Sequence, residues 1–159
     1  MVDQLLLAKR LFLEACRYAD LKDAVSAGLA VSLLQDACEM MLVALMDKHG
    51  AKGKAKENFT GYLDALAAVN VVIPERTNLI KLNALRVNFK HHGGLPDPSE
   101  AEKYRTRVED FLRRAVTDYF GLPFDDLSLV ELVPFPEGQG PTQGGGGVHR
   151  QRRAREGGD

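Results

Sequence analysis

Apolar residues recur every three or four positions along most of this chain, and no strand-like alternation extends beyond a few residues. This spacing is typical of amphipathic α-helices, which repeat every 3.6 residues. The pattern predicts helices over about residues 3–19, 21–48, 59–69, 74–92 and 99–120. Because short connections favour antiparallel neighbours, the sequence predicts an all-α domain, an up-and-down bundle of four to five antiparallel helices.

The second of these helices is apolar around most of its circumference, so we expect it to be the most buried. Its exception is a narrow polar stripe on one face, made of Ser32, Gln35, Asp36 and Glu39. The stripe is either an interface with the fourth helix or a solvated edge of the bundle. As an interface, it would let Asp36 or Glu39 orient a basic side chain of the fourth helix.

Proline, glycine and capping residues suggest where the later helices begin and end. Pro74 suits the first position of the fourth helix, because its missing N–H costs nothing there. Gly93 suits the left-handed residue that ends this helix. Ser99 and Glu102 have the spacing of a capping box for the fifth helix. A further short helix is expected over residues 125–133.

Composition changes after residue 134, so we expect a bundle over residues 1–134 and a disordered Gly/Arg-rich tail over 135–159. The tail contains four consecutive glycines and the basic cluster 149–155, but little apolar surface to offset its ordering entropy. The basic cluster is interpreted as part of a solvated tail, with an RNA-binding arm as the alternative.

The sequence also suggests a location. No signal peptide is apparent, and the longest unbroken apolar run, residues 40–46, is far shorter than the roughly 20 residues that span a bilayer, so no membrane contact is expected. Cys16 and Cys38 lie on apolar helical stripes with no metal-site spacing, which favours a structural role in a reducing cytoplasm. A net charge of −1 excludes a broad electrostatic surface for nucleic acid, but not a small cationic cleft.

The end of the fourth helix is the one segment whose residues suggest chemistry. It gathers basic and amide side chains within a few turns: Asn83, Arg86, Asn88, Lys90, His91 and His92. Histidine titrates near pH 7 and can take a proton from a ribose 2′-hydroxyl. The planar fork of arginine suits the negative charge of a pentavalent phosphate. Arg86 and His91, as i and i+5, lie about 140° apart on an ideal helix.

With this bundle pattern, the Arg86-x4-His91 motif resembles the HEPN superfamily of helical-bundle ribonucleases and their inactive relatives. His92 fits the longer spacing of the same motif. The resemblance implies a metal-independent endoribonuclease without a cofactor, acting in stress, toxin–antitoxin or anti-phage defence. It also implies that Arg86 and His91 of two subunits form a composite site across a homodimer cleft and leave a 2′,3′-cyclic phosphate. A cognate antitoxin or other regulatory protein is a possible partner.

One departure from the family pattern concerns the residue after Arg86, usually polar but here Val87. Asn88, three positions before His91, could substitute for it. We interpret Lys90 and His92 as rim residues near phosphate, and Asn83, Asn88, Asp36 and Glu39 as supporting residues. The alternatives are an ion pair of Arg86 with an acid of the second helix, and a non-catalytic dimerisation or nucleotide-sensing module of the same fold.

Overall fold

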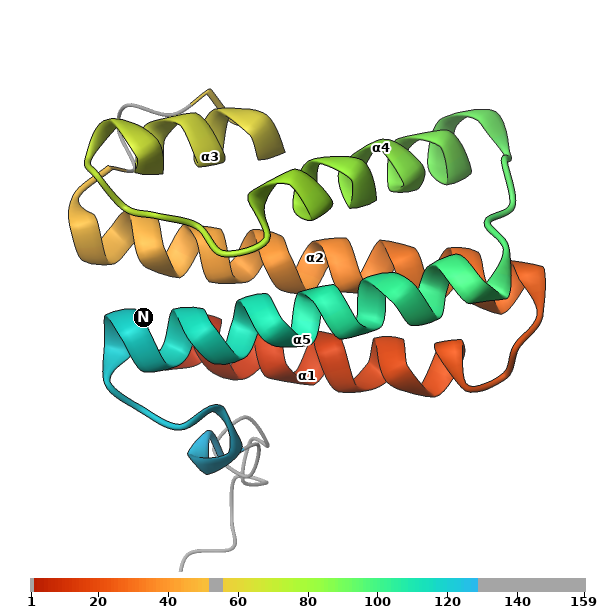
Figure 1. Ribbon diagram of the computed structural model, residues 1–159, viewed down its shortest axis with the longest axis horizontal. Coiled ribbons are helices and arrows are strands. Elements are labelled where there is room, and N and C mark those ends of the chain that lie inside the picture. The colour runs from red at the N-terminus through yellow and green to blue at the C-terminus, as the bar shows by residue number, and fades with distance from the viewer. Residues whose placement is uncertain (1, 52–55, 129–159) are drawn as a thin grey trace, which may run out of the picture.

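The computed structural model describes residues 2–51 and 56–128, which form an all-helical bundle, as predicted. Figure 1 shows α2 across the middle, α3 and α4 following one another along one side of it, and α1 and α5 along the other. Every other α-helix contacts α2. The α-helices are α1 (Val2–Ala19), α2 (Ala24–His49), α3 (Phe59–Ala68), α4 (Arg76–His92) and α5 (Pro98–Phe120).

The core consists of the apolar stripes that the sequence predicts. In α1, the residues of the 3,4 repeat are all buried: Leu5, Ala8, Phe12, Ala15 and Ala19. As expected, α2 is the most buried helix, with residues such as Leu34, Met41 and Leu42 fully enclosed. Only Leu79 and Leu82 of α4 are buried, so this helix is covered mainly on the side that faces α2.

By length and composition α2 could cross a membrane, although its charge-interrupted sequence contains no long unbroken apolar run. Within the bundle, 67% of its most apolar 18-residue stretch is buried against the other helices. A core helix of a soluble protein has the same properties, so this feature is weak evidence for a membrane span.

Three predicted helix starts are wrong by two or three residues. The second helix is expected from about residue 21, but α2 begins at Ala24, after its N-cap Asp23, whose side chain accepts from the Ser26 amide. The capping box of α5 uses Asp97 and Glu100 rather than Ser99 and Glu102, and Pro98 occupies the first turn. The fixed φ of proline is preorganised for that position, which moves the start of the helix upstream. At α4, Glu75 has a left-handed φ of 60°, which separates Pro74 from the helix that begins at Arg76.

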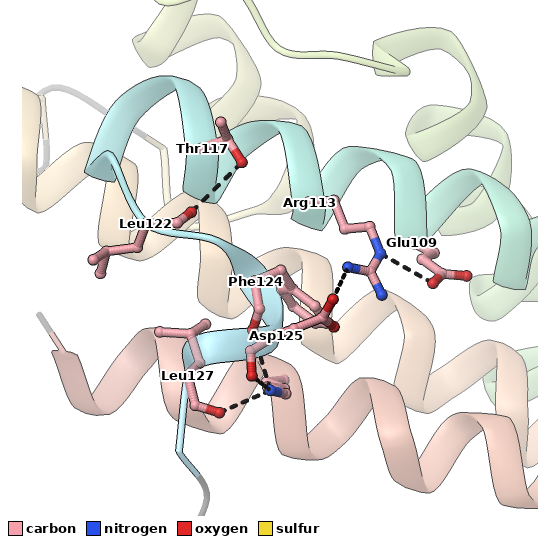
Figure 2. A network of polar contacts seen from close by, with 8 residues as sticks. Glu109, Arg113, Thr117, Leu122, Phe124, Asp125 and Leu127 are labelled. Carbon is pink, nitrogen blue, oxygen red and sulfur yellow. Dashed lines mark hydrogen bonds and ion pairs between the residues drawn. The ribbon is translucent and has the colours of Figure 1, made fainter.

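A 3₁₀ turn follows α5 where a short helix was expected over residues 125–133. It is η2 (Phe124–Asp126), and the described chain ends shortly after it, at residue 128. Residues 127 and 128 are described and are not helical, so this part of the predicted helix is wrong. Residues 129–133 and the tail predicted to be disordered lie outside the described residues. Figure 2 shows the polar contacts that fix this turn, among them the ion pair of Arg113 Nη1 with Asp125 Oδ2 at 3.0 Å.

Lys9 of α1 anchors the same turn from the opposite side. Its Nζ donates to the carbonyl oxygens of Phe124, Asp125 and Leu127 at 3.1, 3.1 and 2.7 Å. It also lies 5.3 Å from the centroid of the Phe124 ring, which packs edge-on against Phe12. One ammonium group therefore uses all three of its donors to hold the segment after α5 on α1.

Replacing Lys9 by Met should release residues 124–127 while the five α-helices persist. Three carbonyl groups would lose a charged donor, at an expected cost of about 1–3 kcal/mol in the free energy of unfolding. Hydrogen exchange of the Leu127 amide, which donates to the Phe124 carbonyl, should accelerate. Lys81→Met on α4, whose side chain is exposed, is the control. Equal protection of Leu127 in both variants would contradict the anchoring role.

Candidate functional site

Polar side chains occupy the seam between α2 and α4, where most packed helices place apolar ones. Arg86 of α4 donates from Nη2 to Asp36 Oδ1 of α2 at 3.2 Å. One turn toward the start of α4, Asn83 Oδ1 accepts from Gln35 Nε2 at 3.5 Å, and that amide also donates to Glu39 Oε2 at 3.3 Å. Gln35 and Asp36 of the α2 polar stripe therefore contact the fourth helix, which supports the interface interpretation for this part of the stripe.

Arg86 is partly buried in this seam. Its side chain is 22% exposed, and its Nε is buried with no hydrogen-bond partner in the structure. Asp36 is 37% exposed and keeps part of its carboxylate open to solvent. The ion pair with Asp36, which the sequence allowed as the alternative to a catalytic role, is therefore present. It leaves the guanidinium at the surface with donors to spare.

Glu39 connects the seam to α3. Together with burial, which is the larger cause, the negative charge of Glu39 raises the pKa of Tyr62, a half-buried residue of α3. Both effects disfavour the phenolate, so Tyr62 remains a neutral hydroxyl at physiological pH. Glu39 therefore contributes charge and a hydrogen bond to the seam, while Asp36 is the acid that contacts Arg86.

The three basic residues of the last turn of α4 lie elsewhere on the helix. Lys90, His91 and His92 are exposed, and none of the hydrogen bonds or ion pairs found between side chains of the described residues involves them. The helix ends directly after them at Gly93, whose φ is 66°. Arg86 faces α2, and His91 is turned away from it by about 140°, so one copy does not bring the motif together.

Close packing at two glycines fixes this end of α4. A Cβ atom on Gly28 of α2 would overlap the ring of Phe89, so that ring lies directly on the α2 backbone. A Cβ atom on Gly94 would overlap the side-chain amide of Asn88. Asn88 therefore folds over the turn that follows the two histidines. Its contact with Gly94 was not expected from the sequence, which suggested that Asn88 acts beside His91.

The sequence did not reveal an apolar hollow beside Arg86. This hollow, of about 340 Å³, is open to solvent, and its lining combines three helices: Leu7 and Leu11 of α1, Asp36, Glu39 and Met40 of α2, and Arg86 of α4. Leu7 is 41% exposed. The signal in the sequence is the pair Leu7 and Leu11, one turn apart and outside the core stripe of α1.

Metal-binding and thiol groups were the other candidates for a functional site in the described part of the chain. No group of three or more His, Cys, Asp or Glu side chains there is placed to hold a metal ion. Cys16 and Cys38 are both free thiols, and burial raises the pKa of each. Comparisons of the chain with known protein families, with curated proteins and with solved structures find no match.

Proposed function

We propose that this protein is a metal-independent endoribonuclease that cuts RNA at a composite site formed by Arg86 and His91 of two copies. The observation that carries the proposal is the placement of Arg86. Asp36 holds a guanidinium with unused donors at the protein surface, and no hydrogen bond or ion pair found within residues 2–51 and 56–128 involves the histidine rings of the same helix. The motif's resemblance to the HEPN superfamily supports this assignment.

The chemistry would proceed without a metal. When the RNA is bound with a ribose beside His91, the imidazole accepts the proton of the 2′-hydroxyl while the 2′-oxygen attacks the adjacent phosphorus. Arg86 stabilises the negative charge that gathers on the pentavalent phosphate. The bond from phosphorus to the 5′-oxygen then breaks, that oxygen takes a proton from water, and His91 returns the proton it accepted to the solvent. The products are a 2′,3′-cyclic phosphate and a 5′-hydroxyl, so no net water or electron is consumed.

A second copy is part of this proposal for a geometric reason. Arg86 points toward α2, and the last turn of α4 presents His91 about 140° away, so the two groups of one chain act on different sides of the helix. The motif of a neighbouring copy can supply the missing group to each side. Lys90 and His92 would then lie at the rim of the site, where flanking phosphates pass.

A non-catalytic interaction module is the second candidate function, and the uncovered apolar hollow beside Arg86 favours it. Such a protein would dimerise, or sense a nucleotide, without cutting RNA, and Val87 would mark the loss of the polar residue after Arg86. Exposed apolar surface of this kind commonly marks an interaction site. This candidate requires the same fold and the same dimer, so catalysis alone separates the two.

The cellular setting belongs to the same proposal. The free thiols Cys16 and Cys38 suit a reducing cytoplasm. A stress, toxin–antitoxin or anti-phage role would require control of the nuclease, by an antitoxin or another regulatory protein that covers the His91 end of α4.

Labelled single-stranded RNA incubated with the purified full chain and EDTA tests the proposal. We expect cleavage at pH 6–8, because neither Arg86 nor His91 needs a metal to act. The same sequence with 2′-deoxyribose at every position should remain intact, since it lacks the attacking hydroxyl. RNA that survives intact with a correctly folded dimer would favour the interaction module instead.

A further inference from the structure

We propose that a second copy of this chain docks on the face formed by α1 and α2, with its own α1 and α2 completing a four-helix arrangement. We call this the α1–α2 face, and its residues are Leu7, Leu11, Glu14 and Tyr18 of α1 with Leu29, Leu33, Asp36 and Met40 of α2. This inference rests on the proposed function for its use of a second copy, and the contact is measured without RNA.

The spacing of these residues is the first argument. On each helix, the four residues of the face are spaced four, three and four positions apart. The third residue is acidic, Glu14 on α1 and Asp36 on α2, and the other three are apolar or aromatic. These stripes lie outside the core stripes of their own helices. Leu7, Leu29 and Tyr18 remain 41%, 40% and 37% exposed. A 3,4 stripe uncovered by its own chain is the pattern with which helices pack against further helices.

The shape of the face is the second argument. Beside the hollow at Arg86 lies another of about 360 Å³, lined by Glu14 and Tyr18 of α1 and by Leu29, Ser32 and Leu33 of α2. Two open hollows therefore follow the same pair of helices. Each can accept a large apolar side chain, and Tyr18 and Leu29 of a second copy are side chains of that kind.

Charge selects a second copy over a strongly charged partner. Glu14 accepts from Arg10 at 3.0 Å and from Arg17 at 3.1 Å. Asp36 is paired with Arg86 at 3.2 Å. Both acids of the stripes are therefore neutralised within their own chain, so the face needs no basic partner. An isologous contact places identical faces together, so the acids within each stripe have to be compensated in their own chain, as Glu14 and Asp36 are. Glu39, which lines the first hollow beside the stripe, accepts from the neutral amide of Gln35.

A two-fold contact here would also bring two copies of Arg86 to one interface, because Arg86 lines the first hollow. The interface would then hold a guanidinium from each subunit. Each would remain oriented by its own Asp36.

Light scattering of the full chain after size exclusion tests the contact. The wild type should have twice the 17.5 kDa mass of one chain at micromolar concentrations. Leu7→Glu and Leu29→Glu should each weaken the dimer at least about tenfold, since each replaces apolar contact area with a charged group that has to lose its water on docking. Leu13→Glu is the matched control, because Leu13 is 39% exposed on the same helix but lies outside the α1–α2 face.

A wild type that stays monomeric up to about 100 µM would overturn the inference, because its dissociation constant would then exceed that of most specific complexes. The inference would also fail if the Leu7→Glu and Leu29→Glu variants dimerise as tightly as the Leu13→Glu control, because the dimer would then use another face. A dimer that responds as expected but leaves RNA intact would support the interface and refute the proposed nuclease. Circular dichroism confirms that each variant is folded.

Discussion

A His91→Ala variant should lose RNA cleavage by about 10²–10⁴-fold, the usual contribution of a positioned general base or acid. His91 is exposed on the last turn of α4, and none of the hydrogen bonds found among the described residues involves its ring. Its removal should therefore leave the stability and the helical circular dichroism unchanged. The measurement is the rate of cleavage of labelled RNA in EDTA under single-turnover conditions.

His49→Ala is the matched control for this variant. His49 also lies in the last turn of a helix, but its Nδ1 contacts the Leu45 carbonyl at 2.9 Å, and its ring packs edge-on against Tyr119. It is thus a structural histidine, and its replacement should affect stability more than cleavage. Equal rates for wild type and His91→Ala would exclude His91 as the base.

Arg86 requires a different design, because its removal has two consequences. Arg86→Ala should lower cleavage by about 10²–10³-fold, the range found when one transition-state donor is removed. It also leaves Asp36 without its ion-pair partner. The double variant Arg86→Ala with Asp36→Asn removes the stranded carboxylate, so it should recover stability without recovering cleavage. Recovery of cleavage in the double variant would show that Arg86 has only a structural role.

Leu42→Ala should lower the free energy of unfolding by about 3–5 kcal/mol, the range for a fully buried leucine whose cavity does not close. Leu42 has no exposed surface and lies in α2, the helix that every other α-helix contacts. A typical domain is stable by about 5–15 kcal/mol, so this single change should remove a large part of the total.

Urea denaturation followed by circular dichroism measures this effect. Leu13→Ala is the control, since Leu13 is a leucine of a neighbouring helix that is already 39% exposed. It should change the free energy of unfolding by less than about 1 kcal/mol. Similar losses for Leu42→Ala and Leu13→Ala would contradict the central position of α2.

The core could be predicted from the sequence because burial follows the helical repeat. Each position of the α1 repeat from Leu5 to Ala19 is buried, and α2 is enclosed as its composition predicts. The starts of α4 and α5 could not be placed as well, because several residues compete for the same cap. Asp97 beside Pro98 provides a better first turn than Ser99 does, and the left-handed Glu75 interrupts the chain after Pro74.

The candidate site was predicted in part. The polar stripe of α2 indicated a contact with α4, and the structure selects Asp36 as the partner of Arg86. The position of Asn88 over Gly94 was not predictable, because it depends on the turn after α4 rather than on helical spacing. The hollow beside Arg86 combines Leu7, Met40 and Arg86 from three helices, so it becomes visible only when the helices are packed.

The chemistry of the RNA ends tests the central claim most directly. Mass spectrometry of the products formed by wild-type protein in EDTA should find 2′,3′-cyclic phosphates and 5′-hydroxyls, in amounts that fall together with the cleavage rate in the His91→Ala variant. These ends follow from attack by the neighbouring 2′-hydroxyl, with His91 as the base and Arg86 beside the phosphate. Intact RNA, or products ending in 3′-hydroxyls and 5′-phosphates, would contradict the account.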